Sequence, residues 1–256
     1  MSRLLGGRSL VAALLALVAV GLATAIAASA EQLPPGSVRV LPPVAGSPSN
    51  LRWTASFAQP AAAELQAYNV DIARGYRFDR RAAHGTCTVA QARSSACPAK
   101  SRIGSGVGQV TVLAPSIPRR EFSLTINFFI TAPQRKGDIA GLVLAGREPT
   151  SGLTFALVGR IVPLRRGPYG LELRFANTAA ELPSGVTVQL HRVDVRFGTQ
   201  RTVTRGTGAS RRRLTYHLLT NPTVCPRRGW PFLLTVTYST GSEKYSAFGA
   251  CTARRR

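Results

Sequence analysis

Apolar and polar residues alternate along most of the chain after residue 50. The clearest run covers residues 121–131, where every second residue, from Phe122 to Ile130, is apolar. Similar runs cover residues 51–57, 169–175 and 230–238. A period of two is typical of a strand that buries one face, so these runs predict β-strands.

Four segments depart from this simple pattern. Residues 139–145 are apolar on both faces, as in a central strand, and residues 88–93 have the composition of a short helix. The parity of the apolar positions changes near His191, which predicts a β-bulge there, because a one-residue slip moves every side chain to the other face. Residues 198–210 lack an apolar face and are expected to form a mobile loop.

The spacing of these segments predicts the fold class. About ten strands, separated by turns rich in Gly and Pro, indicate an all-β protein, an antiparallel β-sandwich with little helix. We expect a Pro/Gly/Ser-rich arm at residues 31–50, one β-sandwich domain at 51–252 and a basic tail at 253–256. Glycines 104, 106 and 108 lead into a strand rather than a helix. They therefore predict bulging or close strand approach instead of a phosphate-binding loop.

Residues 1–30 have the three-part layout of a secretory signal peptide. Arg3 and Arg8 precede an uncharged run from residue 10 to 28, and small residues end the segment at Ala30. An uncleaved membrane anchor is the alternative, since the run is nearly long enough to span a bilayer. We expect cleavage after Ala30 and a secreted or extracytoplasmic protein of the cell envelope.

The four cysteines, Cys87, Cys97, Cys225 and Cys251, all follow this segment. An exported chain favours disulfides over free thiols, and three pairings are possible. We expect Cys87–Cys97 and Cys225–Cys251, because each pair is close in sequence and flanked by turn residues. A zinc site is the weaker alternative, because the spacing contains no Cys-x-x-Cys pair.

The chain carries 33 Lys and Arg against 11 Asp and Glu, a formal charge of +22. A surface of this charge attracts anions, although a compositional bias toward Arg would produce the same excess. Arginine makes bidentate contacts with phosphate and carboxylate groups. We expect the candidate anion-binding residues to lie in turns: Arg119, Arg120, Arg165, Arg166, Arg211, Arg212, Arg213, Arg227 and Arg228.

Catalytic signatures are scarce. There is no G-x-S-x-G motif, and the three histidines are scattered along the sequence. The acidic residues are isolated, whereas a glycosidase needs two carboxylates facing one cleft. Asp71 and Asp79 are near each other in sequence, but neighbouring arginines favour ion pairing. We therefore predict no catalytic, cofactor-binding or metal-binding residues.

Two segments resemble a known group of proteins. Residues 97–104, Cys-Pro-Ala-Lys-Ser-Arg-Ile-Gly, and residues 221–225, Asn-Pro-Thr-Val-Cys, followed by Trp230 and Cys251, are similar to motifs in uncharacterised exported β-rich proteins of actinobacteria. The resemblance covers residues 75–252. It implies export, disulfides and a β-rich domain, and no catalytic residue or ligand, because no function is assigned to that group.

These observations favour a noncatalytic exported β-sandwich, a binding or structural module that associates with anionic envelope or extracellular polymers. We expect the partner to be an anionic polymer or membrane surface, and we expect neither specific nucleic-acid recognition nor a small-molecule cofactor. The alternative is a secreted carbohydrate-active hydrolase on a β-sandwich scaffold. The sequence leaves the oligomeric state open.

Overall fold

The computed structural model describes residues 36–57, 65–114, 117–149, 154–176 and 187–254. The predicted signal peptide, the first residues of the predicted arm and the last two arginines lie outside these ranges.

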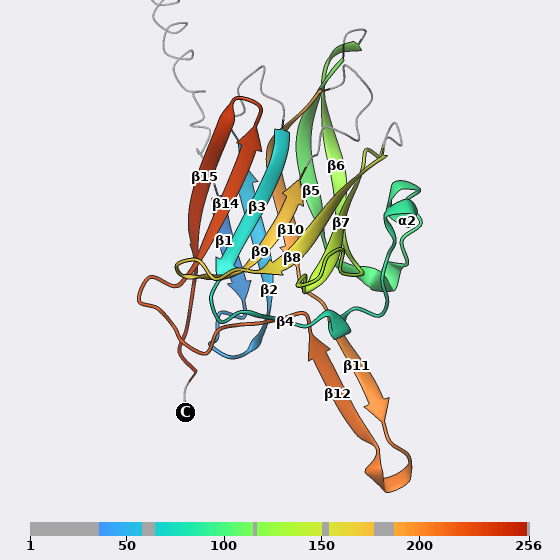
Figure 1. The fold of residues 1–256 in the computed structure, drawn as a ribbon, viewed down its shortest axis with the longest axis vertical. Coiled ribbons are helices and arrows are strands. Elements are labelled where there is room, and N and C mark those ends of the chain that lie inside the picture. The colour runs from blue at the N-terminus through green and yellow to red at the C-terminus, as the bar shows by residue number, and fades with distance from the viewer. Residues whose placement is uncertain (1–35, 58–64, 115–116, 150–153, 177–186, 255–256) are drawn as a thin grey trace, which may run out of the picture. The chain divides into compact units, whose positions relative to one another are not determined.

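Antiparallel β-strands account for most of this part of the chain (Figure 1), which confirms the all-β prediction. The strands are β1 (Gly36–Leu41), β2 (Pro48–Ser56), β3 (Leu65–Ala73), β4 (Arg77–Phe78), β5 (Arg102–Ala114), β6 (Ile117–Thr131), β7 (Ala140–Arg147), β8 (Thr154–Pro163), β9 (Tyr169–Ala176), β10 (Thr187–Phe197), β11 (Gln200–Arg205), β12 (Arg212–His217), β13 (Leu219–Thr220), β14 (Trp230–Tyr238) and β15 (Gly241–Gly249). The helical segments are short: η1 (Arg80–Ala82), α2 (Val89–Arg93), η2 (Ala99–Ser101) and η4 (Gly208–Ser210).

One large sheet forms the body of the protein. Its strands follow the order β15-β14-β3-β9-β8-β7-β6-β5-β10-β2-β13-β4, in which β13 and β4 are two residues long, and β1 pairs with the other side of β2. The sheet curls so far that β1 comes to lie against β15. Two layers of strands therefore face each other across one core, as in a β-sandwich. The segment expected to be an arm contributes β1, and β2 begins at Pro48, three residues before the predicted domain boundary.

A single apolar cluster fills the space between the layers, with side chains from almost every strand. Trp230 and Phe232 of β14, Phe175 of β9 and Ile72 of β3 are almost completely buried. The rings of Trp53 and Phe232 pack edge to face with centroids 6.1 Å apart. The alternation seen in the sequence thus corresponds to side chains that point in turn into this core and away from it.

The glycine-rich strand β5 lets the sheet curl. A Cβ on Gly106 would lie 2.1 Å from the carbonyl oxygen of Asp194, and one on Gly104 would lie 2.5 Å from that of Arg196. Strand β10 therefore approaches β5 so closely that any residue larger than glycine at position 104 or 106 would overlap it, and the sequence predicted such a close approach. The β5–β10 register shifts between Leu190 and Arg192, which confirms the predicted bulge.

Both predicted disulfides, Cys87–Cys97 and Cys225–Cys251, are present. The first closes a loop that contains α2. Thr88 caps this helix, and Ala92 packs it against the outside of β7 and β8. The second joins the segment before β14 to the segment after β15. The first disulfide therefore closes a connection that packs on the outside of the sheet, and the second joins two segments at the end of the sheet.

Candidate anion-binding surface

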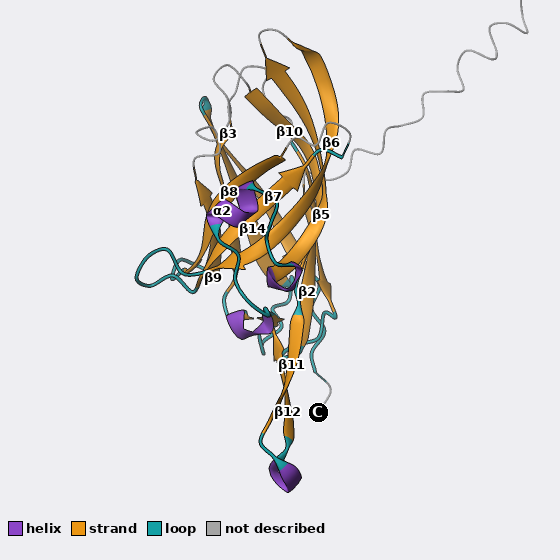
Figure 2. Cartoon of the chain, turned by 90° about the vertical axis from the view of Figure 1, so that its right-hand side faces the viewer, coloured by secondary structure: helices purple, strands orange, loops and turns teal. Residues whose placement is uncertain are grey.

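Strands β11 and β12 form a separate two-stranded hairpin that projects from one end of the body (Figures 1 and 2). The prediction of a mobile loop at residues 198–210 is wrong for part of this segment, because strand β11 occupies Gln200–Arg205. The turn needs glycine, since Gly206 has a φ of +83° and Gly208 a φ of +54°. Ser210 Oγ donates a 2.7 Å hydrogen bond to the carbonyl of Thr207 and closes the turn.

The hairpin concentrates positive charge. Residues 200–217 contain five arginines, at positions 201, 205, 211, 212 and 213, and no Asp or Glu. Arg205 and Arg212 are direct cross-strand partners, an arrangement of like charges that destabilises an isolated hairpin. None of the five forms an ion pair with a carboxylate in the described ranges. Their charges are therefore available to an external anion.

One face of the hairpin is hollowed. A shallow groove of about 530 Å³ is lined by Thr202 and Thr204 of β11 and by Arg211 and Arg213 beside them. Thr202 and Thr215 share a 3.0 Å hydrogen bond between their hydroxyl groups. Guanidinium and hydroxyl groups both donate hydrogen bonds, so the groove suits an anionic group with several oxygen atoms.

Contacts with η1 hold the base of the hairpin. The guanidinium carbon of Arg81 lies 4.5 Å from the centroid of the Tyr216 ring. Asp79 accepts hydrogen bonds from the Arg81 side chain, and this contact lowers the pKa of Asp79. The backbone N–H of Asp79 also donates to the carbonyl of Leu218 at 2.9 Å. The hairpin therefore starts from a fixed position on the body.

Other basic connections lie at the same end of the sheet as the hairpin. By strand register these connections cover residues 74–83, 132–139, 164–168, 198–229 and 250–254. Together they contain sixteen Lys and Arg but only two acidic residues, Asp79 and Asp138. Both acidic residues are paired with arginine. We call this region the basic end.

The predicted arginine clusters divide between the two ends of the sheet. Arg165 and Arg166 are exposed in the β8–β9 connection, and Arg227 and Arg228 are exposed in a turn before β14, all at the basic end. Arg228 lies over the ring of Phe248 at 4.9 Å.

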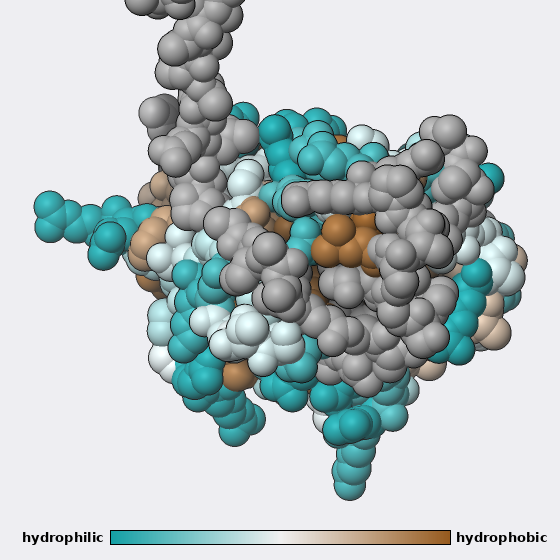
Figure 3. Space-filling view, turned by 90° about the horizontal axis from the view of Figure 1, so that it is seen from above, coloured by the Kyte–Doolittle hydropathy of each residue, from teal (hydrophilic) through white to brown (hydrophobic). Residues whose placement is uncertain are grey.

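The remaining clusters correct the prediction that all of these residues lie in turns. Arg212 and Arg213 belong to β12, and Arg119 and Arg120 belong to β6. Arg120 pairs with Val112, whereas Phe197, just before the hairpin, pairs with Gly104. Eight residues along β5 separate these pairs by about 26 Å. Arg119 and Arg120 therefore lie away from the basic end. Figure 3 views that opposite end, where hydrophobic surface is visible between hydrophilic residues.

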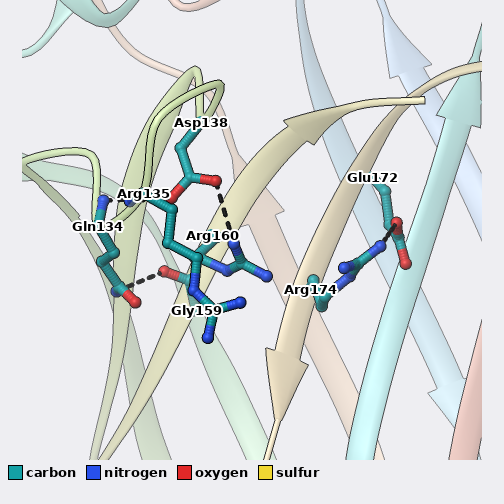
Figure 4. A network of polar contacts seen from close by, with 7 residues as sticks. All are labelled: Gln134, Arg135, Asp138, Gly159, Arg160, Glu172 and Arg174. Atoms are coloured by element: carbon teal, nitrogen blue, oxygen red, sulfur yellow. Dashed lines mark hydrogen bonds and ion pairs between the residues drawn. The ribbon is translucent and has the colours of Figure 1, made fainter.

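Asp138 and Glu172 belong to an ion-pair network on the outside of the sheet (Figure 4). Asp138 accepts hydrogen bonds from the backbone N–H of Arg135 at 2.9 Å and from Arg160 at 3.2 Å. Arg174 donates a 2.5 Å hydrogen bond to Glu172. The network fixes the β6–β7 turn to β8 and neutralises its own charges.

Asp71 and Glu172 are directly opposite each other on β3 and β9, and both are nearly inaccessible to solvent. Burial, followed by the charge of Glu172, raises the pKa of Asp71, and Arg166 partly offsets this effect. Arg166 lies 3.4 Å from Asp71. The sequence missed this pair because 100 intervening residues hide the pairing. Both carboxylates contact arginine, and neither lines the groove on the hairpin.

A second hollow, of about 190 Å³, lies between the loop carrying α2 and strands β6 and β7, with Phe129 and Arg147 among its lining residues. In the described ranges, no three His, Cys, Asp or Glu side chains are placed to hold a metal ion. His191, expected beside a bend, makes a 2.6 Å hydrogen bond with Thr111 at the β10 bulge.

Comparisons with known proteins found no matching family model, no similar curated protein and no similar solved structure. The resemblance noted from the sequence motifs therefore remains an expectation. The two disulfides are typical of an oxidising compartment. None of the helices in the described ranges is long and apolar enough to cross a membrane.

Proposed function

We propose that this protein is an exported, noncatalytic binding module that associates with anionic envelope or extracellular polymers through its basic end. The observation that carries this proposal is the hairpin of residues 200–217, with five arginines, no acidic residue and no ion pair to a described carboxylate. A protein gains no fold stability from such a projection, because like charges lie opposite each other and few apolar side chains are buried.

The surrounding charges support the same function. The basic end presents sixteen Lys and Arg from several connections, and its two carboxylates are already paired. A long polymer can contact several of these groups at once, so many weak surface contacts add up. The hydrolase alternative has less support, because the opposed carboxylates Asp71 and Glu172 are both buried and in contact with arginines.

Salt-titrated binding to an anionic wall polymer tests the proposal. We expect binding at low salt that weakens as salt rises, since surface charges are screened over about 10 Å at 0.1 M salt. The variant R211Q/R212Q/R213Q removes three charges from the hairpin. The control variant R119Q/R120Q/K244Q removes three charges from β6 and β15. Binding should fall in the hairpin variant and change little in the control. Absence of binding by the unaltered protein at low salt would refute the proposal.

A further inference from the structure

The two faces of the hairpin differ in their chemistry. The β11–β12 register places Thr202 opposite Thr215, and Thr204 opposite Arg213, on one face. Arg211 lines the groove on this same face. We call it the threonine face. The other face carries Arg205 opposite Arg212, and residues 201, 203, 214 and 216.

Only the threonine face is open along its length. Tyr216, at the base of the other face, is covered by the guanidinium of Arg81 at 4.5 Å. The segment η1 contacts both β11 and β12 there. A polymer chain laid along the hairpin would therefore meet η1 on one face and the open groove on the other.

The groove presents hydrogen-bond donors from several directions. Arg211 and Arg213 are two residues apart in an extended segment, so their attachment points repeat at roughly 6.6 Å along the hairpin. The hydroxyls of Thr202 and Thr204 come from the neighbouring strand, about 4.8 Å away. Because Thr215 can donate to Thr202, the proton of Thr202 remains available to a ligand. Donors that converge from two strands suit a tetrahedral phosphate better than a planar carboxylate, which a single guanidinium satisfies.

None of the four residues that line the groove carries a ring on which a nucleic-acid base could stack. The imidazole of His217 shares the threonine face but lies at the base of the hairpin, opposite Gln200, and Tyr216 belongs to the other face and already packs against Arg81. Proteins that bind single-stranded nucleic acids combine a basic groove with aromatic side chains that stack on the bases. The groove therefore favours a phosphodiester chain without bases.

We infer that the groove on the threonine face binds consecutive phosphates of a polyol-phosphate polymer, with Arg211 and Arg213 contacting the phosphate oxygens and Thr202 and Thr204 donating further hydrogen bonds. This inference rests on the proposed function and assigns its ligand class.

The test measures binding of the full-length mature protein to poly(glycerol phosphate) at several salt concentrations. The variant R211Q/R213Q removes two charges from the groove, and R205Q/R212Q removes two from the other face of the same hairpin. By analogy with single nucleic-acid strands, each neutralised phosphate contributes about 0.7 to the slope of log affinity against log salt. We expect R211Q/R213Q to lower the slope by about 1.4 and R205Q/R212Q to lower it by clearly less.

A third variant, T202V/T204V, keeps every charge. We expect it to weaken binding to poly(glycerol phosphate) roughly tenfold through the lost hydrogen bonds. Binding to polyglutamate, a polycarboxylate, should stay unchanged. Circular dichroism of each variant checks that the sheet is intact.

Several results would overturn the inference. These are equal losses in the two arginine variants, no effect of T202V/T204V, or tighter binding of polyglutamate or a single-stranded oligonucleotide than of poly(glycerol phosphate). In those cases the proposed function would stand as long as binding depends on the basic end. Failure of every anionic polymer to bind at low salt would refute both.

Discussion

Removing the Cys225–Cys251 disulfide should substantially destabilise the protein. The bridge spans 26 residues of sequence and encloses β14 and β15. In the chain-entropy description, opening a loop of this length lowers the free energy of unfolding by about 3.5 kcal/mol. We expect the native contacts around the bridge to remain in a variant without it. Among these contacts, Asn221 Nδ2 donates hydrogen bonds to the carbonyls of Pro42 and Val44, each at 2.9 Å. The loss therefore acts mainly through the unfolded chain.

Equilibrium urea unfolding of C225S/C251S measures this effect. With an unchanged urea dependence, the midpoint should fall by on the order of 1–2 M. The matched control is C87S/C97S, whose loop spans only 10 residues and should cost about 2.7 kcal/mol. A loss below about 1 kcal/mol for C225S/C251S, or a larger loss in the control, would refute the assignment of loop closure as the main contribution.

Three further changes have defined outcomes. Gly106→Ala should cost about 1–3 kcal/mol or more in urea unfolding, because its Cβ would overlap the backbone of β10, whereas Gly36→Ala, whose nearest neighbour is 3.8 Å away, should change little. The pKa of Asp71 is raised in the folded state, so the folded protein binds a proton at Asp71 more tightly than the unfolded chain does. The free energy of unfolding should therefore rise as pH falls from that raised pKa toward the ordinary value of 3.8. Asp71→Asn should remove this rise in the free energy of unfolding between pH 7 and 4. The same dependence of urea unfolding on pH in the variant and the unaltered protein would contradict the prediction. Tyr216→Ser should speed trypsin cleavage within residues 201–213 without moving the urea midpoint, because the ring holds the base of the hairpin.

The strands of the body could be predicted because each buries one face. Every second position is apolar in residues 121–131 and 169–175, and these segments form parts of β6 and β9. The bulge near His191 was predictable for the same reason, since a change in parity has few other causes. The disulfides followed from proximity in sequence and the turn residues beside them.

The hairpin and the carboxylate pair escaped prediction for physical reasons. Strand β11 has no apolar face, so its threonines and arginines produce no period of two in hydrophobicity. Asp71 and Glu172 come together only through the pairing of β3 with β9, which local sequence does not encode. The sequence therefore identified Arg211 and Arg213, but not the groove that brings them together with threonines.

The contact between β1 and β15 has a consequence for the timing of folding. The first and last strands of the body are neighbours, and Val44 forms a bridge with Thr252 near the far end of the sequence. A chain made from its N-terminus cannot complete this sheet until its last residues are available. Until then one edge of β2 and one edge of β3 lack their hydrogen-bonding partners, β10 and β14, which come more than 130 residues later in the sequence. We therefore expect assembly of the body to follow synthesis of the whole chain, with the earlier strands dependent on protection from aggregation in the interval.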